Sequence, residues 1–299
     1  MLEFRDVSKR FGRSRRDALH RLTLTFSEGE VLGLVGLNGA GKTTTIRIAA
    51  GVILTSGGDV VVEGKSITTD KAQASRSIGW VPETPAHDPR ASLSRLCNYY
   101  ADLRGDHGST RARDLLSEWG VLQFEGRAFG TLSLGERKRF ALAVAGVGDP
   151  AYYLLDEVFN GLDPLALTQV RNWILQGKKT QKGFLVSSHQ LREVQAISDR
   201  IAFLHEGRLI RCLDAREIPS SSRKRLQIAF DPIDANAMRI LGSFGEVEQG
   251  RGGVTLTGEG VDPAAINMSL VRAGYSVRRL EAADPELETF FLHLIGEQS

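Results

Sequence analysis

Short apolar runs and stretches with helical spacing alternate along residues 1–213, and this alternation predicts an α/β domain. The runs at 31–35, 152–155 and 183–187 consist mainly of apolar residues, which is typical of parallel strands buried on both faces. A helix is expected directly after the first run, over 42–50. Further strands are expected at 22–26, 59–62, 78–82, 201–204 and 209–211.

The spacing becomes helical between residues 92 and 148, so we expect a mostly helical subdomain, about 86–148, inside the α/β domain. Two sets of large side chains each share one helical face there. These sets are Leu93, Leu96 and Tyr100, and Leu115, Leu116 and Trp119.

A second, smaller domain is expected after the Pro-Ser-Ser-Ser stretch at 219–222, which predicts a linker. The predicted domains are therefore 1–218 and 219–299. The second would be a ferredoxin-like α+β domain with the element order βαββαβ and one added helix. Its expected elements are strands at 226–230, 247, 254–256 and 275–280, and helices at 233–241, 263–273 and 285–295.

Composition adds few constraints beyond an ordinary globular protein. The 299 residues are 41% hydrophobic and 25% charged, and the net charge is +2, so no overall basic field attracts nucleic acid. The two cysteines, Cys97 and Cys212, lie far apart and are expected to be reduced thiols. No apolar run approaches the roughly 20 residues that cross a bilayer. A membrane process would therefore need its membrane part from another chain.

A glycine-rich loop between the predicted strand at 31–35 and helix at 42–50 has the spacing of a phosphate-binding loop. Glycines let many backbone N–H groups approach a polyphosphate, and the following helix directs its positive end at the phosphates. Lys42 would supply a full charge to the β- and γ-phosphates, and the Thr43 hydroxyl could bind Mg²⁺. An unliganded glycine turn fits this strand-to-helix setting less well. The nucleotide-binding residues are predicted to be Gly36, Asn38, Gly39, Ala40, Gly41, Lys42, Thr43 and Thr44.

Two carboxylates follow the apolar strand at 152–155. Asp156 at the strand end could hold Mg²⁺, and Glu157 is placed to polarise an attacking water. A surface acidic pair is the alternative when these residues are taken alone. The phosphate-binding loop upstream favours the functional interpretation.

Three more stretches have a characteristic order: Leu132-Ser133-Leu134-Gly135-Glu136, Asn160-Gly161-Leu162-Asp163 and Val186-Ser187-Ser188-His189. Together with the loop and the carboxylates, they resemble the ATP-binding cassette of ABC transporters over roughly residues 2–213. The resemblance implies ATP as the nucleotide and Mg²⁺ as its metal.

The resemblance also implies roles for single residues. Ser133 and Gly135 belong to the signature motif, which in this family binds the γ-phosphate held by the opposite subunit. Asp163 corresponds to the aspartate that communicates across the dimer, His189 to the histidine that contacts the γ-phosphate, and Phe11 to an aromatic that stacks on adenine. Simpler interpretations are a helix N-cap for Ser133, a structural histidine for His189 and a core position for Phe11.

Two residues depart from the usual family pattern. Leu134 replaces the first signature glycine, and Glu83 stands where a glutamine usually contacts Mg²⁺ and the attacking water. A carboxylate would still suit Mg²⁺, so Glu83 is kept among the predicted catalytic and metal-site residues and is expected to tune the rate. The basic cluster Arg13, Arg15 and Arg16 and the run at 223–225 could meet phosphates or anionic lipids, but a solvated loop is favoured.

The sequence thus predicts the ATPase subunit of an ABC exporter at the cytoplasmic face of the membrane. Its expected partners are an integral membrane permease and a second copy of itself or a paralogue, without nucleic acid. Residues 287–292 resemble the closing element of drug- and antibiotic-export ATPases. One alternative is a soluble ABC ATPase acting on nucleic acid or ribosomes, and another is a nucleotide-binding scaffold without turnover.

Overall fold

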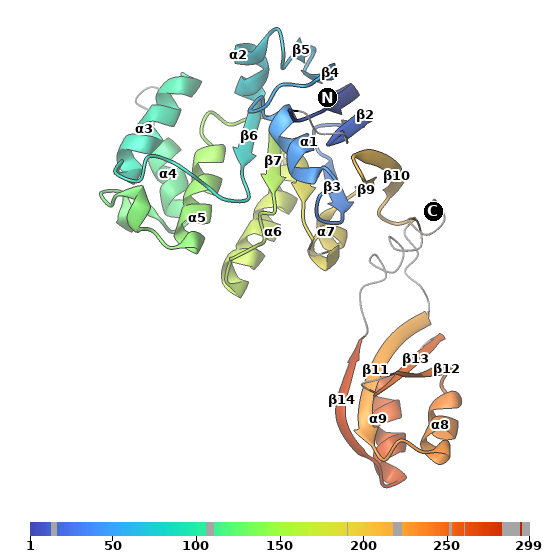
Figure 1. Cartoon of the computed structure of the whole chain (residues 1–299). Coiled ribbons are helices and arrows are strands. Elements are labelled where there is room, and N and C mark those ends of the chain that lie inside the picture. Colours follow the sequence, from blue (N-terminus) through green and yellow to red (C-terminus); the bar gives the residue numbers. More distant parts are fainter. Residues whose placement is uncertain are drawn as a thin grey trace. The chain divides into compact units, whose positions relative to one another are not determined.

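The chain divides into two compact units, Met1–Ala215 and Arg216–Ser299, in a computed structural model (Figure 1). The structure describes residues 1–12, 17–105, 111–189, 191–217, 223–250, 253–259, 261–282 and 294. Four predicted features lie outside these residues: the cluster Arg13, Arg15 and Arg16, the linker at 219–222, the tail element at 287–292, and the helix at 285–295, of which only residue 294 is described. The side chains of 223–225 lie outside them as well.

A six-stranded sheet forms the centre of the first unit, in the order β10-β9-β3-β8-β7-β6. All neighbouring strands are parallel except the antiparallel pair β10 and β9. The predicted parallel arrangement of the runs at 152–155 and 183–187 is confirmed, because Tyr152 pairs with Gly183 and Asp156 with Ser187. The strands are β3 (Val31–Gly36), β6 (Ile78–Val81), β7 (Tyr152–Asp156), β8 (Gly183–Ser187), β9 (Arg200–His205) and β10 (Arg208–Asp214).

Helix α1 (Lys42–Ala49) follows β3, as predicted, and its apolar side chains pack between two sheets. The second sheet is antiparallel and four-stranded, in the order β2-β1-β4-β5. Its Phe4 and Leu24 share one core with Ile46 and Ile48 of α1. The elements are β1 (Leu2–Lys9), β2 (Leu19–Phe26), β4 (Gly57–Val62), β5 (Lys65–Ser66) and a short helix α2 (Lys71–Ala74).

Helices dominate residues 93–145, as the sequence predicts. The side chains Trp119 and Phe140 are buried at their centre, and the same core continues under the sheet to Phe184. The helices are α3 (Leu93–Arg104), α4 (Arg111–Glu118) and α5 (Leu134–Ala145). Two more helices, α6 (Pro164–Lys179) and α7 (Leu191–Ile197), connect the central strands.

The described residues of the second unit form an antiparallel sheet in the order β12-β13-β11-β14, with helices α8 and α9 between its strands along the chain. Along the chain its elements follow the order βαββαβ, and their apolar faces form a separate core around Phe230 and Leu256. The ferredoxin-like classification stays a prediction. The elements are β11 (Arg223–Asp231), α8 (Ala235–Gly242), β12 (Glu246–Gly250), β13 (Gly253–Glu259), α9 (Pro263–Arg272) and β14 (Ser276–Ala282).

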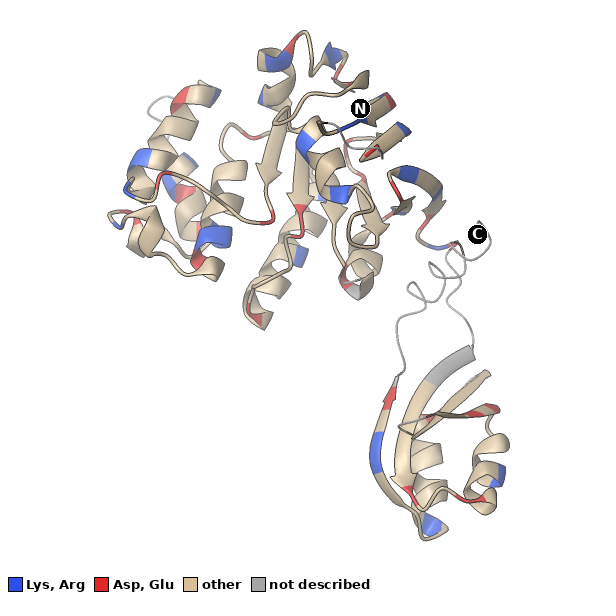
Figure 2. Cartoon of the chain, in the orientation of Figure 1, with Lys and Arg blue, Asp and Glu red and all other residues tan. Residues whose placement is uncertain are grey.

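Charged residues of both signs are interspersed over the described parts of both units (Figure 2). Among the described residues, no helix combines the length and the apolar character needed to span a bilayer. Cys97 and Cys212 are free thiols.

Candidate active site

The glycine loop connects β3 to α1 and packs tightly on its neighbours. A Cβ at Gly36 would lie 2.5 Å from the carbonyl oxygen of Leu204, and one at Gly41 would lie 2.8 Å from that of Ala18. Gly41 also has a φ of 108°, a backbone conformation that favours glycine. These two glycines therefore let the loop lie against β9 and the start of β2 while its N–H groups stay at the helix entrance.

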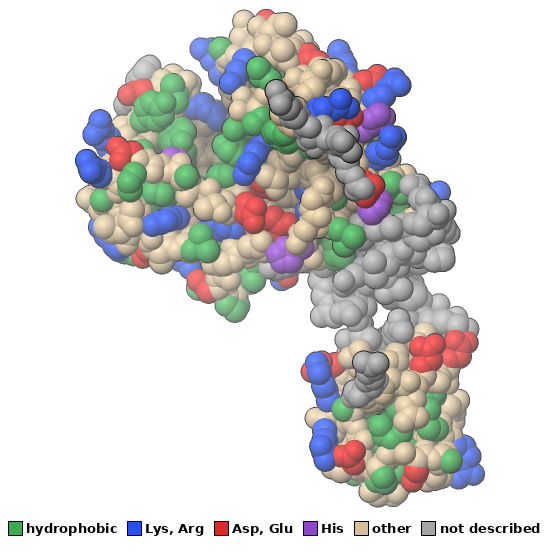
Figure 3. Space-filling model, in the orientation of Figure 1, with side chains coloured by type: hydrophobic (Ala, Val, Ile, Leu, Met, Phe, Trp, Pro, Cys, Tyr) green, Lys and Arg blue, Asp and Glu red, His purple; other side chains and the backbone are tan. Residues whose placement is uncertain are grey.

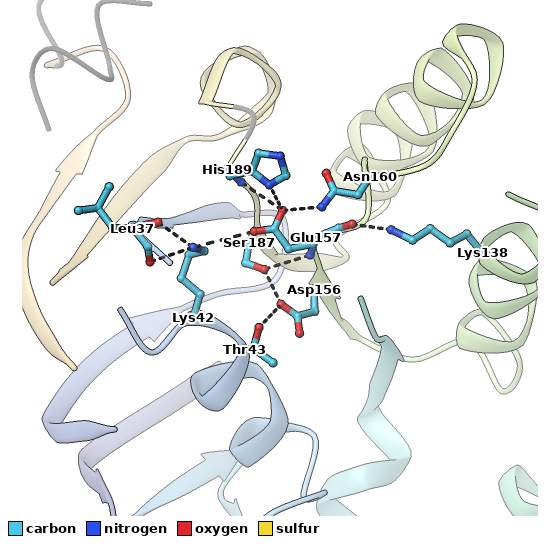
Figure 4. Close-up of polar contacts among 10 residues, drawn as sticks. Leu37, Lys42, Thr43, Lys138, Asp156, Glu157, Asn160, Ser187 and His189 are labelled. Atoms are coloured by element: carbon cyan, nitrogen blue, oxygen red, sulfur yellow. Dashed lines mark hydrogen bonds and ion pairs between the residues drawn. The ribbon is translucent and has the colours of Figure 1, made fainter. Parts of the chain in front are cut away.

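Lys42, the first residue of α1, is buried and folds its ammonium group over the loop. Its Nζ donates a hydrogen bond to the carbonyl oxygen of Gly36 at 2.7 Å and one to that of Leu37 at 3.4 Å. The same atom lies 3.9 Å from Oε1 of Glu157 (Figure 4). A single positive charge therefore stands between the loop and a carboxylate, where a phosphate could share it.

Thr43 and Asp156 meet across the gap between α1 and β7. Thr43 Oγ1 donates to Asp156 Oδ1 at 3.1 Å, and Ser187 Oγ donates to the same oxygen at 2.8 Å. Asp156 Oδ2 is buried and has no hydrogen-bond partner among the described residues. Burial raises the pKa of the Asp156 carboxyl above its usual range, although the bonds from Ser187 and Thr43 act in the opposite direction.

This arrangement fits a magnesium ion. A buried carboxylate oxygen without a partner and a neighbouring hydroxyl are hard oxygen ligands. The described residues contain no cluster of three His, Cys, Asp or Glu that could cage a metal by itself. Mg²⁺ usually takes one or two protein ligands and completes its shell with phosphates and water, so two ligands suffice.

Glu157 is held at both its backbone and its carboxylate. Its φ is 47°, a left-handed conformation that is uncommon for a residue with a side chain. Its Oε2 accepts hydrogen bonds from the main-chain N–H of His189 at 3.2 Å and from Asn160 Nδ2 at 3.3 Å. His189 Nδ1 lies 2.9 Å from the same oxygen (Figure 4). The carboxylate is thereby directed toward the loop.

A cavity of about 500 Å³ joins most of the predicted residues. Its lining combines Glu83, Glu157 and His189 with residues of the glycine loop. Gly36 and Asp156 do not line it but contact the lining residues Lys42 and Thr43. Its lining residues are Ala18, Asn38, Gly39, Ala40, Gly41, Lys42, Thr43, Thr44, Glu83, Glu157, Asn160 and His189.

The predicted residues Ser133, Gly135 and Asp163 are not among the lining of this cavity. Ser133 is exposed and is the N-cap of α5, as the simpler interpretation predicts. Its Oγ accepts from the N–H of Glu136, whose carboxylate in return accepts from the N–H of Ser133 at 2.7 Å. Asp163 is likewise the N-cap of α6 and forms an ion pair with Arg139 at 2.5 Å.

Phe11 is 48% exposed and has the Lys9 ammonium 5.0 Å from its ring centroid, so it is no core residue. It is not among the residues that line a second hollow of about 630 Å³, which also borders the loop. That hollow shares Asn38, Gly39 and Ala40 with the first. Its other lining residues are Asp17, His20, Leu37, His205, Glu206 and Arg208.

Sequence reasoning missed three residues that contact this site: Lys138, Asn160 and Ser187. Asn160 and Ser187 stand inside motifs that the sequence singles out, so a search of the polar residues flanking each carboxylate could have found them. Lys138 gave no such signal, because it lies in the charged run 136–139, which is typical of a solvated helix face.

Comparison with known proteins agrees with this geometry. A family profile described as "ABC transporter" matches residues 19–160. The chain is 32% identical to the "Uncharacterized ABC transporter ATP-binding protein YhcH" of Bacillus subtilis, and the match covers 99% of this chain and 96% of that protein. The chain belongs to the ABC transporter family.

Other relatives of this ABC ATPase include one of similar length and one that is about ten times longer than the matched segment. The "Bacitracin transport ATP-binding protein BcrA" of Bacillus licheniformis is 27% identical over 97% of this chain and 96% of its own. The chain spans only 10% of the mouse "ATP-binding cassette sub-family A member 7", to which it is 34% identical over 73% of this chain. A solved "ATP binding subunit of ABC transporter" shares the fold with a TM-score of 0.68 and 28% identity, covering 73% of this chain and 91% of its own.

Proposed function

We propose that this ABC ATPase is the energy-supplying subunit of an exporter. Two copies, or this chain and a paralogue, close around two ATP molecules, and closure drives a separate membrane permease. The observation that carries the proposal is the convergence of Lys42, the Thr43–Asp156 pair and the Glu157–His189 pair around one cavity. This is the set of charges and hydrogen-bonding groups that phosphoryl transfer to water requires.

The roles of the residues follow from their positions. Lys42 leaves the carbonyl groups of its own loop and binds the β- and γ-phosphates. Thr43 and Asp156 would hold Mg²⁺, which would neutralise phosphate charge. Glu157 accepts a proton from the attacking water, and His189, next to it, contacts the γ-phosphate. Glu83 faces the same cavity and is exposed, so it can reach the water or the metal.

The position of Ser133 supports the use of a second copy. Ser133 and Leu134, at the start of the 12-residue helix α5, are exposed, and the rest of the first turn is half-buried. None of these residues is among the lining of the cavity of their own chain. A helix N-terminus is a ready anion site, because its N–H groups and dipole favour negative charge. In the proposed dimer it binds the γ-phosphate on the partner's loop, with Gly135 allowing close approach and Asp163 beside the interface.

An apolar groove in the first unit supports the permease partner. A hollow of about 390 Å³ lies between helix α3, helix α5 and strand β6, with Tyr100, Val144 and Trp80 among its lining residues. Hydrophobic side chains are gathered on the helical region and on the facing part of the core (Figure 3). The groove is suited to a short cytoplasmic helix of a permease, and this would place the chain at the cytoplasmic face of the membrane.

Transport is supported by the relative named for bacitracin transport. Export as the direction rests on the resemblance of residues 287–292 to the closing element of drug- and antibiotic-export ATPases. The interspersed charges of the described residues give no basic face for nucleic acid, which weighs against the soluble alternative.

The proposal is tested by isolating the full-length chain from membranes under mild detergent and identifying its partners by mass spectrometry. We expect a polytopic membrane protein in stoichiometric amount and magnesium-dependent ATP hydrolysis by the complex. Recovery with ribosomes or nucleic acid, without a membrane protein, would contradict the proposal. Tight ATP binding without turnover would instead support the scaffold alternative.

A further inference from the structure

Lys138 is a buried cation that the proposed reaction does not use. It lies on the second turn of α5, five residues after Ser133, and its side chain is 1% exposed. Its Nζ donates a 2.6 Å hydrogen bond to the main-chain carbonyl oxygen of Glu157 (Figure 4). The helix that begins at the signature serine therefore directly contacts the residue proposed as the catalytic base.

Burial of this ammonium group is energetically costly. Burial lowers the pKa of Lys138 to about 8, although the nearby carboxylates of Glu83, Glu157 and Asp156 act in the opposite direction. Removing a charge from water costs several kcal/mol, and apolar side chains of similar volume often fill such positions without loss of stability. A role in stability alone therefore does not account for a lysine here.

The backbone of Glu157 offers a specific reason. A left-handed conformation is energetically unfavourable for a residue with a side chain and persists only where its surroundings impose it. The N–H of Glu157 donates to the carbonyl oxygen and to Oγ of Ser187, both at 3.1 Å. The carbonyl of Glu157 accepts from Lys138 and, more weakly at 3.2 Å, from the N–H of Asn160. The bond from Lys138 is charge-assisted and thus the stronger of the two.

Two further contacts join α5 to the segment that follows Glu157. Arg139 pairs with Asp163, and the side chain of Leu134 lies so close to Gly161 that a Cβ there would be 2.9 Å from Leu134 Cδ2. Gly161 has a φ of 72°, so the chain turns sharply under this helix. The first turns of α5 and residues 157–163 are thus packed as one body.

We propose that Lys138 is a positioning residue for catalysis, which holds the carbonyl of Glu157 and thereby keeps the left-handed backbone that directs its carboxylate into the cavity. This inference rests on the proposed role of Glu157 as the base. It has a consequence for the dimer. Because Lys138 and Ser133 share one helix, a displacement of α5 when Ser133 binds phosphate on the partner's loop reaches Glu157 in its own chain.

The test compares the full-length parent chain with Lys138→Met, Glu157→Gln and the double variant. Methionine keeps the unbranched shape but cannot donate, so the fold should hold. We expect Lys138→Met to lower kcat by between about tenfold and a hundredfold, because a misplaced group costs that much. The KM for ATP should stay within about twofold and Tm should be equal or higher, since neither binding nor packing is lost.

The double variant separates positioning from general damage. If Lys138 acts through Glu157, the methionine should not further slow the residual single-turnover hydrolysis of Glu157→Gln. The matched control is Lys182→Met, which removes a lysine that pairs with Asp149 away from the site and should leave kcat unchanged. An unchanged kcat in Lys138→Met would overturn the proposal. So would an equal loss of hydrolysis rate when Lys138→Met is added to the parent and to Glu157→Gln.

A crystal structure of Lys138→Met tests the conformation of Glu157 without any measurement of turnover. Glu157 is expected to leave the left-handed region and its carboxylate to lose the contact with His189. A parental Glu157 conformation in this variant would overturn the inference, whereas the proposed function would fail separately if the parent chain hydrolysed no ATP. Lys138→Leu, which likewise cannot donate to the Glu157 carbonyl, replaces the methionine variant in the same measurements if that protein aggregates.

Discussion

His189 and Glu157 meet at the carboxyl ends of two neighbouring parallel strands, with Nδ1 of the histidine 2.9 Å from Oε2 of the glutamate. Asp156 and Ser187, the last residues of β7 and β8, pair in the register that brings the two side chains together. The side chain of His189 is 58% exposed, whereas that of Glu157 is buried. The pair therefore has one partner fixed in the protein and one that can reach a nucleotide.

Glu157→Gln is expected to abolish turnover without loss of ATP binding. Glutamine keeps the shape and the hydrogen bonds from His189 and Asn160 but cannot accept a proton from water. We expect kcat to fall by about 10²–10⁴-fold, the usual contribution of a general base. Steady-state hydrolysis and equilibrium binding of ATP measure the two effects. Glu125→Gln, at a partly exposed residue paired with Arg113, is the control and should behave as the parent. Ordinary hydrolysis by Glu157→Gln would remove it from the base role.

Ser133 is expected to act on the ATP bound by the other copy. A Lys42 variant lacks phosphate binding and a Ser133 variant lacks the facing anion site, so each homodimer is inactive. A mixture of the two forms dimers that contain one intact composite site. We expect activity to return as the mixing ratio approaches one to one, measured as hydrolysis at constant total protein. Absence of recovery at every ratio would argue against assembly in trans.

The two roles of Ser133 can be separated with Ser133→Asp. Aspartate is an equally good N-cap, so Tm should stay close to that of the parent. Its negative charge would repel the γ-phosphate, and turnover should fall by at least about tenfold. Ser92→Asp is a matched control, because Ser92 is the N-cap of the other 12-residue helix of the same region, α3. Turnover that survives Ser133→Asp would indicate that this residue is only a cap.

Asp156→Asn is expected to stabilise the metal-free protein while preventing magnesium-dependent hydrolysis. The pKa of Asp156 is raised by burial, so its ionised form destabilises the fold. This penalty is absent below the unfolded-state pKa, near 3.8, and complete above the folded-state pKa. In EDTA at pH 7, Tm should therefore rise by about 2–4 °C, equivalent to roughly 1 kcal/mol. The difference in Tm between Asp156→Asn and the parent should become smaller as the pH falls toward the unfolded-state pKa. An unchanged Tm at pH 7 would contradict the assigned cause.

The sequence predicted the elements whose apolar pattern is uninterrupted. Strands β3, β7 and β8 and helix α1 lie within one or two residues of their expected bounds. Strand β1 was not predicted, because the charged pair Arg5-Asp6 interrupts its alternation where the register shifts. Helix α6, Pro164–Lys179, is not among the predicted elements either. The antiparallel sheet beside α1 depends on long-range pairing that no local pattern reveals.

The residues of the site likewise include some that the local sequence predicts and one that depends on tertiary packing. The loop and the two carboxylates are predicted because each stands beside a predicted strand or helix, and His189 is predicted from the resemblance to the ATP-binding cassette. Lys138 is not, because its burial is a product of how α5 packs on the segment after β7. A charged residue within a charged helical run normally faces water, and only the tertiary structure shows that this one does not.

The dimer is tested most directly by the mass in solution of the full-length Glu157→Gln protein, measured by light scattering with and without ATP. The account predicts one chain of 32.7 kDa without nucleotide and twice that mass with ATP bound. When Ser133→Asp is added to Glu157→Gln, the double variant should have the mass of one chain even with ATP, although its Lys42 still binds the nucleotide. A Glu157→Gln protein that is saturated with ATP and remains at the mass of one chain would contradict the account.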